Sequence, residues 1–245
     1  IIGAGLSSLY AACKLSKGEY KIEVFEKNSM AGGRSQTFTK DGFEFDMGPS
    51  WYWMPELIDN LFEELGENRS EYFKLTRLSP SYRVFWEKVN QADIPVDMEE
   101  LFKLFDGFEI DGAKKLKSFL ADAEVKYDIA VKDFLENPGL KLSELLKLNN
   151  LQKALKLDIF KSVEKDIFKR FVSKEARSIL SFPALFLGAM PGKIPSLYTM
   201  MNHADLSLGT WYPEGGMNSL AKALETIAKK NGVVFHYNKP VDEIQ

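Results

Sequence analysis

The sequence predicts an α/β fold that a mainly helical segment interrupts, and three observations carry this prediction. A strand stub at residues 1–2 leads through a glycine-rich turn into a helix, and a second strand ends at residue 26, which is the start of a βαβ unit. Leucine, lysine, glutamate and phenylalanine then recur at helical spacing over 98–186, within an expected insertion over 97–208. A turn, a helix and a strand return at 209–245. We therefore expect parts 1–96 and 209–245 to form one Rossmann-like domain around a helical insertion.

Composition excludes several classes of function. The 245 residues hold 32 Lys+Arg against 35 Asp+Glu, a formal charge of −3 that gives no general attraction to nucleic acid. One cysteine (Cys13) and two histidines (His203 and His236) supply neither a disulfide framework nor a zinc site, so we expect no metal chemistry. The chain begins without methionine and ends on what reads as the start of an element, so we expect a fragment of a longer protein.

Local sequence patterns predict each helix and strand of the two α/β parts. Alternating strand-forming residues predict the strands, and apolar residues at helical spacing that end near glycine or asparagine predict the helices. In chain order, the expected elements are a helix over 6–15, a strand over 20–26, a strand over 43–47, a helix over 55–65, a strand over 82–86, a turn over 211–216, a helix over 217–230 and a strand over 233–236.

Two features of the insertion leave alternatives open. Residues 98–186 are expected to form four to six helices, and residues 111–177 hold 15 Lys+Arg against 11 Asp+Glu. This lysine-rich face is either simply solvated or in contact with an anionic membrane surface. The apolar run 179–190 is either a buried core helix or the lining of an apolar tunnel or a monotopic membrane contact. Prolines interrupt this region too often for a bilayer-spanning helix of about 20 residues.

The first glycine-rich turn has the pattern of a dinucleotide site. Gly3 permits a tight turn, and Gly5 allows a pyrophosphate to approach the backbone at a helix N-terminus. Ser8 stands where the pattern has a third glycine and is small enough for close packing. Glu26 ends the second strand 21 residues after Gly5, where a carboxylate accepts hydrogen bonds from both ribose hydroxyls. An acid there argues against NADP, and the competing interpretation is an exposed glutamate at a strand end.

A second glycine-rich turn, Gly32-Gly33-Arg34, follows the acid. Two glycines and an arginine suit a second approach to the pyrophosphate with a cation nearby. The alternative is a plain turn with an exposed arginine. Dehydrogenases that use only NAD do not need this second turn, whereas one large class of flavoproteins has it.

Five stretches together resemble the phytoene desaturase family, which comprises FAD-dependent carotenoid desaturases within the amine-oxidase-like flavoprotein superfamily. The chain is most similar to desaturases of the Bacteroidetes type, over residues 1–245. The stretches are I-I-G-A-G-L-S-S-L, V-F-E-K-N, G-G-R-S, F-D-M-G-P-S-W-Y-W-M-P and L-G-T-W-Y-P-E-G-G-M. The last two are the most particular to the family and carry the resemblance.

The resemblance implies a set of cofactor-binding residues. The FAD pyrophosphate would lie on the first turn, the adenosine ribose and adenine would lie by the acid, and the segment after the second turn would pass the flavin ring. The backbone after the late strand would face the adenine. The residues implied are Gly3, Ala4, Gly5, Leu6, Ser7, Ser8, Glu26, Lys27, Gly32, Gly33, Arg34, Gly48, Pro49, Ser50 and Val241.

The resemblance also implies an activity. The expected reaction is FAD-dependent desaturation of phytoene in carotenoid biosynthesis, in which an allylic CH2–CH2 unit transfers a hydride to flavin N5. Oxygen or a quinone would be the electron acceptor. The helical insertion would form an apolar substrate channel that opens toward the membrane. The protein would therefore be cytoplasmic and peripheral on the inner face of the cell membrane, with no nucleic acid partner.

Other functions remain open at this stage. A related carotenoid isomerase, saturase or C30 desaturase, an amine oxidase, or a flavin-free isoprenoid-binding escort protein would share much of the pattern. No catalytic residue is assigned, since Asp46 and Glu214 lie near the right motifs but each could be structural. The aromatic residues Trp51, Tyr52, Trp53 and Trp211 either stabilise a polyene cation by their ring faces or pack in the core.

Overall fold

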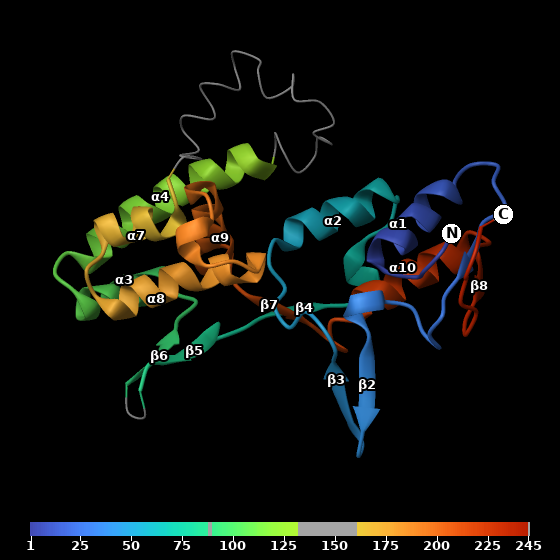
Figure 1. The fold of residues 1–245 in the computed structure, drawn as a ribbon, viewed down its shortest axis with the longest axis horizontal. Helices are drawn as coiled ribbons and strands as arrows, with labels where there is room; N and C mark the ends of the chain where they lie inside the picture. The colour runs from blue at the N-terminus through green and yellow to red at the C-terminus, as the bar shows by residue number, and fades with distance from the viewer. Residues whose placement is uncertain (88–89, 132–160, 245) are drawn as a thin grey trace, which may run out of the picture. The chain divides into compact units, whose positions relative to one another are not determined.

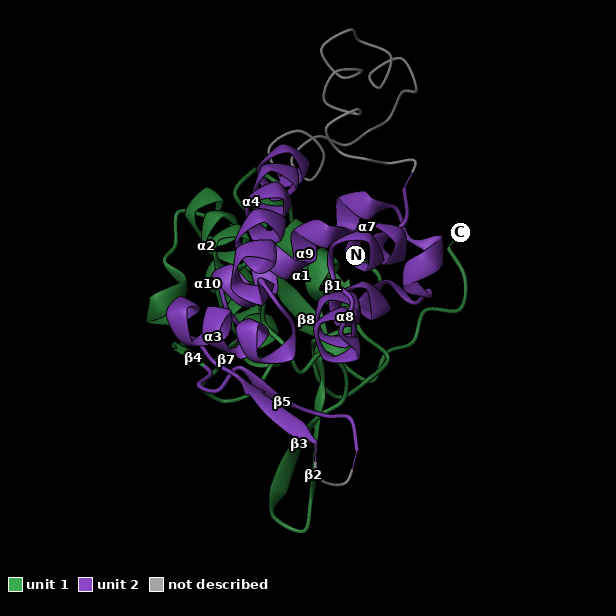
Figure 2. Cartoon of the chain, turned by 90° about the vertical axis from the view of Figure 1, so that its left-hand side faces the viewer, with its two compact units in different colours: residues 1–77, 211–245 green, residues 78–210 purple. Residues whose placement is uncertain are grey.

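The computed structural model describes residues 1–87, 90–131 and 161–244 (Figure 1). The chain divides into two compact units, shown in green and purple in Figure 2. Residues 1–77 and 211–245 make up the first, which we call the α/β unit, and residues 78–210 make up the second, the helical unit. The helical unit therefore begins before the expected residue 97, because a β-hairpin at its start belongs to it.

The centre of the α/β unit is a pair of helices and a short parallel sheet. Helix α1 (Leu6–Leu15) packs against α10 (Ser219–Lys230), and β1 (Glu23–Phe25) pairs in parallel with β8 (Val234–His236). Ile2 forms a parallel bridge with Phe25, so the first strand is only a stub on the other side of β1. Apolar residues of both helices are fully buried. The packing of the two helices on each other places the N-terminus of α1 at the edge of this sheet.

The remaining elements of the α/β unit are short. Helix α2 (Pro55–Glu64) precedes β4 (Leu75–Arg77), which pairs antiparallel with β7 (Trp211–Pro213). The prediction of a turn over the whole of 211–216 was therefore wrong for its first three residues, because pairing with β4 extends them. The hairpin of β2 (Thr37–Lys40) and β3 (Phe43–Asp46) turns at Asp41-Gly42, where φ is 52° and 83°.

The helical unit begins with a hairpin and continues as packed helices. The hairpin joins β5 (Tyr82–Phe85) and β6 (Gln91–Ile94) in antiparallel register. The longer helices are α3 (Met98–Phe108), α4 (Gly112–Ala130), α7 (Val163–Arg170) and α8 (Lys174–Ser181), and α9 (Met200–Asn202) is one turn. Side chains cap three of the starts: Asp97, Ser162 and Ser173 each accept a hydrogen bond from the backbone N–H three residues later.

The core of the helical unit is rich in phenylalanine. Phe171 lies between Phe105 and Phe119, with ring centroids 6.1 and 5.9 Å away in edge-to-face geometry. These three side chains are at most 1% exposed. The part of the expected helical content at 132–160 lies outside the described residues. Among the residues that the structure describes, no helix combines the length and the apolarity needed to cross a bilayer.

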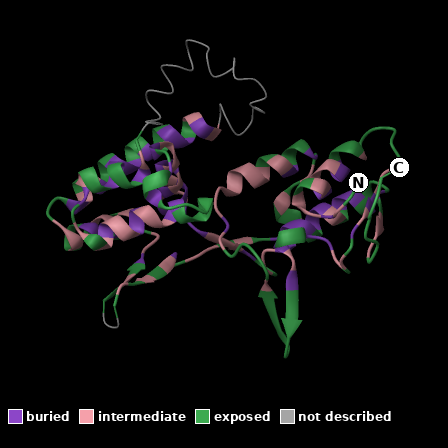
Figure 3. Ribbon diagram, in the orientation of Figure 1, coloured by how far each residue is buried: buried purple, intermediate pink, exposed green. Residues whose placement is uncertain are grey.

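The apolar run 179–190 is not one buried helix. Helix α8 ends at Ser181, and a 3₁₀ helix follows over Phe182–Leu187, because Pro183 supplies no N–H to an α-helical ladder. Residues up to Ala184 are mostly buried, whereas residues 185–190 are exposed (Figure 3). The exposed ones are Leu185, Phe186, Leu187 and Met190, at 41–67%. The core interpretation thus holds for the first half of the run and fails for the second.

The buried carboxyl group of Asp205 links the β5–β6 hairpin to the last residues of the helical unit. Asp205 lies in a π-helical turn (His203–Ser207) and is 1% exposed. The Tyr82 hydroxyl donates to it at 2.7 Å and the Thr210 hydroxyl at 3.1 Å. Burial raises the pKa of Asp205 to about 6, although both hydrogen bonds oppose the shift.

This pKa predicts a stability that falls as pH rises. Folding favours the protonated form of Asp205. Its contribution to the free energy of unfolding is therefore fully present below its unfolded-state pKa of about 3.9 and is lost as the pH rises past about 6. The wild type should therefore lose about 2 kcal/mol of unfolding free energy between pH 4 and pH 7 that Asp205→Asn does not lose. Urea unfolding of both proteins at the two pH values measures this difference. An equal change in both would show that Asp205 is not the titrating group.

Candidate functional site

The first glycine-rich turn and the start of α1 form an open backbone surface. Gly3 has a φ of 83°, a conformation that favours glycine, and no heavy atom lies within 4 Å of a Cβ built on Gly3 or Gly5. The helical ladder starts with the Leu9 N–H, which donates to the Gly5 carbonyl at 2.9 Å. The N–H groups of residues 6–8 precede that ladder, so they are available to an anion at the positive end of the helix.

The second glycine-rich turn packs directly on the first. The Gly32 N–H donates to the Ala4 carbonyl at 2.8 Å, and a Cβ on Gly33 would lie 3.1 Å from the Gly5 Cα. Both glycines have positive φ, 119° and 56°. The Asn218 side chain at the start of α10 holds this turn by donating to the Ser35 carbonyl at 2.7 Å. Neither Ser35 nor Asn218 was predicted, because their contact joins residues far apart in the sequence.

A third segment passes close beside the second turn. Gly48 lies so near the Arg34 backbone that a Cβ built on it would overlap the Arg34 carbonyl oxygen. Glycine is therefore required here by lack of space. This contact brings the Gly48-Pro49 segment, which the sequence places after β3, to the same edge as the two glycine-rich turns.

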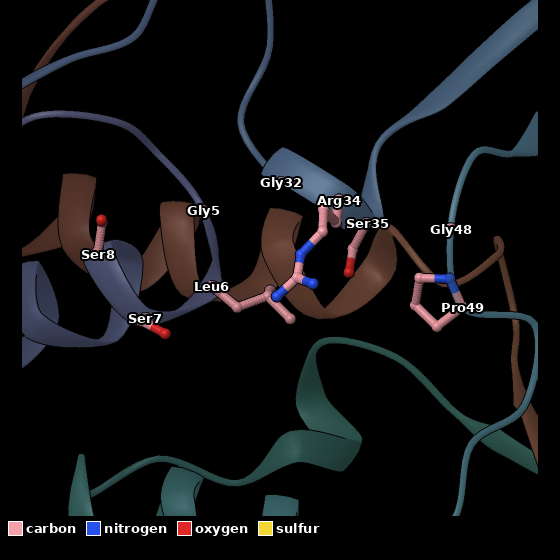
Figure 4. A pocket seen from close by; sticks show the side chains of 9 residues that line it. All are labelled: Gly5, Leu6, Ser7, Ser8, Gly32, Arg34, Ser35, Gly48 and Pro49. Atoms are coloured by element: carbon pink, nitrogen blue, oxygen red, sulfur yellow. The ribbon is translucent and has the colours of Figure 1, made fainter. Parts of the chain in front are cut away.

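The three segments surround a cavity of about 610 Å³ (Figure 4). The lining residues are Gly5, Leu6, Ser7, Ser8, Gly32, Arg34, Ser35, Gly48 and Pro49. The exposed Arg34 is the only charged residue among them. Open glycine backbone, helix N–H groups and one guanidinium together match a pyrophosphate in both shape and charge. The residues present therefore fit the dinucleotide cofactor that the sequence implies.

Seven of the implied residues do not line this cavity: Gly3, Ala4, Glu26, Lys27, Gly33, Ser50 and Val241. Glu26 is 5% exposed, and its carboxylate accepts the Ala4 N–H at 2.7 Å and the Asn28 N–H at 2.9 Å. It therefore braces the first turn. The Lys239 N–H donates to the Glu26 carbonyl at 2.9 Å, which brings the segment that leads to Val241 beside the acid.

A smaller aromatic cavity of about 170 Å³ adjoins the first and shares Leu6, Ser35 and Pro49 with it. Trp51 and Trp53 line it, with ring centroids 5.7 Å apart in edge-to-face geometry. Tyr52 also lines it and is 4% exposed. Burial raises the pKa of the Tyr52 hydroxyl well above its usual value. Trp211 is not among the lining residues of either cavity.

The two acids near the late motifs are placed differently. Asp46 accepts the Tyr212 hydroxyl at 2.6 Å and the Met217 N–H at 3.0 Å, so it joins the end of β3 to the turn before α10. The Tyr212 bond to this carboxylate raises the pKa of Tyr212 to about 12. Glu214 is exposed, and its hydrogen bonds are made by its backbone N–H, which donates, and its backbone carbonyl, which accepts. In the described parts of the chain, no group of histidine, cysteine and acidic residues is arranged to hold a metal ion.

Comparison with known proteins matches the chain to a family model. The model describes flavin-containing amine oxidoreductases and matches residues 5–245. Two curated relatives are each 31% identical over the whole chain: a carotenoid 3,4-desaturase of Haloarcula japonica and a 4,4'-diapophytoene desaturase (4,4'-diaponeurosporene-forming) of Staphylococcus aureus. The chain spans about half the length of these relatives, 50% and 49% respectively.

A solved structure shares the fold. An oxidoreductase from Methanosarcina mazei superposes with a TM-score of 0.61 at 22% identity, covering 100% of this chain and 52% of that chain. At this identity the likeness concerns the fold alone.

Proposed function

The chain belongs to the family of flavin-containing amine oxidoreductases, and from this premise we propose that it is part of an FAD-dependent carotenoid desaturase. The α/β architecture with a helical insertion and the family expected from the sequence are thus confirmed, and the cofactor is FAD. The observation that carries the proposal is the 610 Å³ cavity, where three motifs of one desaturase-like pattern meet around a single arginine.

The cofactor-binding roles follow from the geometry of the site. The N–H groups at the start of α1 and the Arg34 guanidinium would hold the FAD pyrophosphate. Glu26 keeps lone pairs for ribose hydroxyls beyond the two N–H bonds that it accepts, and Lys27 is exposed beside it. Ser50 would contact the flavin end of FAD, and Val241 would contact the adenine end. Bound FAD supplies the hydride acceptor for oxidation of an allylic CH2–CH2 unit.

The described residues contribute positioning and the exclusion of water, and no catalytic base is assigned among them. Asp46 is held by two hydrogen bonds that join the end of β3 to the turn before α10. Trp51 and Trp53 line the aromatic cavity beside the pyrophosphate cavity, and their rings would pack against an apolar polyene chain or stabilise a developing cation there.

Phytoene is the substrate that we propose, with oxygen or a quinone as the electron acceptor. The relatives are named for desaturation of carotenoids, one of them a C30 diapophytoene, so a C30 substrate is the alternative. The exposed apolar residues after Ala184 give the helical unit a surface suited to a membrane. We propose that the protein is cytoplasmic and peripheral on the inner face of the cell membrane, and these exposed residues support the membrane contact.

A flavin-free escort role has little support. Such a protein has no use for a ribose acid or for the second glycine-rich turn, yet the chain keeps both, and the second turn lines the 610 Å³ cavity. Isomerisation or saturation of a carotenoid would use the same cofactor site, and analysis of the product separates these reactions from desaturation.

Expression of the complete gene in a phytoene-accumulating bacterium tests the proposal. We expect coloured conjugated products such as lycopene, and their absorption maxima count the double bonds introduced. Gly5→Asp is the matched negative control, because its carboxylate would enter the pyrophosphate cavity from an otherwise open position. Unchanged phytoene from a wild-type protein that holds FAD would refute phytoene as the substrate, and diapophytoene would be tested next.

A further inference from the structure

A second cavity, of about 490 Å³, lies between α4 and α7 within the helical unit. It shares no lining residue with the glycine-lined cavity. Six of its nine lining residues are cationic: Lys114, Lys115, Lys161, Lys165, Lys169 and Arg170. We call these residues and the space between them the basic cavity.

The cations of the basic cavity come from both helices. Lys165 and Lys169 are four residues apart on α7, so they lie on the same face one turn apart. Lys114 and Lys115 belong to the first turn of α4. Lys169 lies in the last turn of α7, where the helix dipole favours a cation. Lys165 and the two lysines of α4 lie in first turns, where the dipole disfavours a cation, so helix formation does not account for them.

Internal ion pairs neutralise only part of this charge. Lys115 pairs with Glu109, and Arg170 pairs with Asp122 and Asp166. Within the described residues, Lys114, Lys165 and Lys169 have no carboxylate at ion-pair distance, and all three are exposed.

The two acids that line the basic cavity do not cancel the excess. Asp166 is 6% exposed, and its carboxylate already binds the Lys126 ammonium and the Ser196 hydroxyl. Its pKa lies below the usual value because the Ser196 hydroxyl and the Lys126 and Arg170 cations outweigh the effect of burial. Asp111 offsets one lysine, so the cavity keeps a net positive charge.

We propose that the basic cavity binds a phosphate group of an anionic ligand. Lysine ammonium groups act as point charges for phosphate oxygens, and the Ser118 hydroxyl on the wall adds a donor. Two exposed apolar side chains flank the lining residues, Ile110 at 87% and Val172 at 70%. Apolar side chains beside a cationic site are typical of contact with lipid, so a phospholipid headgroup is the favoured source of the phosphate. The proposal does not depend on carotenoid desaturation.

Binding of the complete gene product to two probes tests the site. The first probe is phosphatidylcholine vesicles with and without phosphatidylglycerol. The second is inorganic pyrophosphate, added to protein already loaded with FAD so that the glycine-lined cavity is filled. Lys165→Ala/Lys169→Ala should weaken partition to the anionic vesicles about 30-fold, since each lysine near an anionic surface contributes a factor of about 5. The matched control is Lys103→Ala/Lys117→Ala, which removes two exposed lysines of the same unit that lie outside the basic cavity.

Each outcome bears on the proposal. Loss in the cavity variant, with the control within about 3-fold of wild type, supports a phospholipid source. Loss of pyrophosphate binding without a change in vesicle binding supports the phosphate site and assigns it to a soluble ligand. An equal loss of binding in the cavity variant and the control variant, or no binding of either probe by the wild type, would overturn the proposed phosphate site. Circular dichroism verifies that both variants fold, and neither variant changes the FAD-binding residues.

Discussion

Replacing Lys126 by methionine is expected to lower the free energy of unfolding by about 3–5 kcal/mol, because one partner of a buried ion pair would be lost. Lys126 is 3% exposed, and its ammonium lies 3.2 Å from the Asp166 carboxylate. It also donates to the hydroxyls of Ser196 and Thr199 at 2.9 and 3.1 Å. These contacts join α4, α7 and the 3₁₀ turn Ser196–Thr199, so the loss should be felt across the helical unit.

The charge partner gives this prediction a sharp control. In Lys126→Met/Asp166→Asn no uncompensated charge stays buried, so the double variant should recover at least half of the loss. Lys117→Met, which removes an exposed lysine of the same helix, should change stability by less than about 0.5 kcal/mol. Urea unfolding of the four proteins measures these differences. A double variant less stable than Lys126→Met would show that hydrogen bonding, and not charge balance, holds this cluster together.

Replacing Glu26 by alanine is expected to weaken FAD binding about 10–100-fold, since hydrogen bonds to a charged group contribute about 1.5–3 kcal/mol. The same change should lower the unfolding free energy of the apoprotein by about 2–4 kcal/mol. The buried Ala4 N–H would lose its acceptor, whereas water can replace the carboxylate at the half-buried Asn28 N–H. Quenching of flavin fluorescence and urea unfolding measure the two effects separately.

Glu23→Ala provides the matched control on the same strand. Glu23 is partly exposed and contacts the His236 ring at 2.9 Å, away from the first glycine-rich turn. Its replacement should leave the FAD dissociation constant within about 3-fold of wild type. If Glu26→Ala lowers stability but leaves FAD affinity unchanged, the acid is only a brace for the turn and does not contact the ribose.

Much of this fold could be predicted from neighbouring residues. Apolar residues at helical spacing place α1 correctly at Leu6–Leu15, and Pro55 with Gly66 brackets α2 to within a residue. Serine and aspartate caps act over three residues, so they too are visible in the sequence. Eight of the implied cofactor-binding residues line one cavity, since the two glycine-rich turns carry their own backbone requirements.

The misplaced features depend on distant partners. Residues 211–213 run into the turn-forming sequence Pro-Glu-Gly-Gly at 213–216, yet they form β7 because β4 lies alongside. The apolar run 179–190 divides into a buried and an exposed half, which hydrophobicity along the chain does not distinguish. Ser35 was missed because the contact that fixes it comes from Asn218, 183 residues later.

The sequence by itself determined where the backbone must turn, which helices form and that a dinucleotide motif is present, because these depend on residues a few positions apart. Only the tertiary structure decided what each acid does. Glu26 follows one alternating strand and Asp46 ends another, but packing surrounds each with different donors: two backbone N–H groups for Glu26, and a tyrosine hydroxyl with one N–H for Asp46. A carboxylate's role follows from the donors within about 3 Å of it, and chain segments distant in sequence supply three of these four donors.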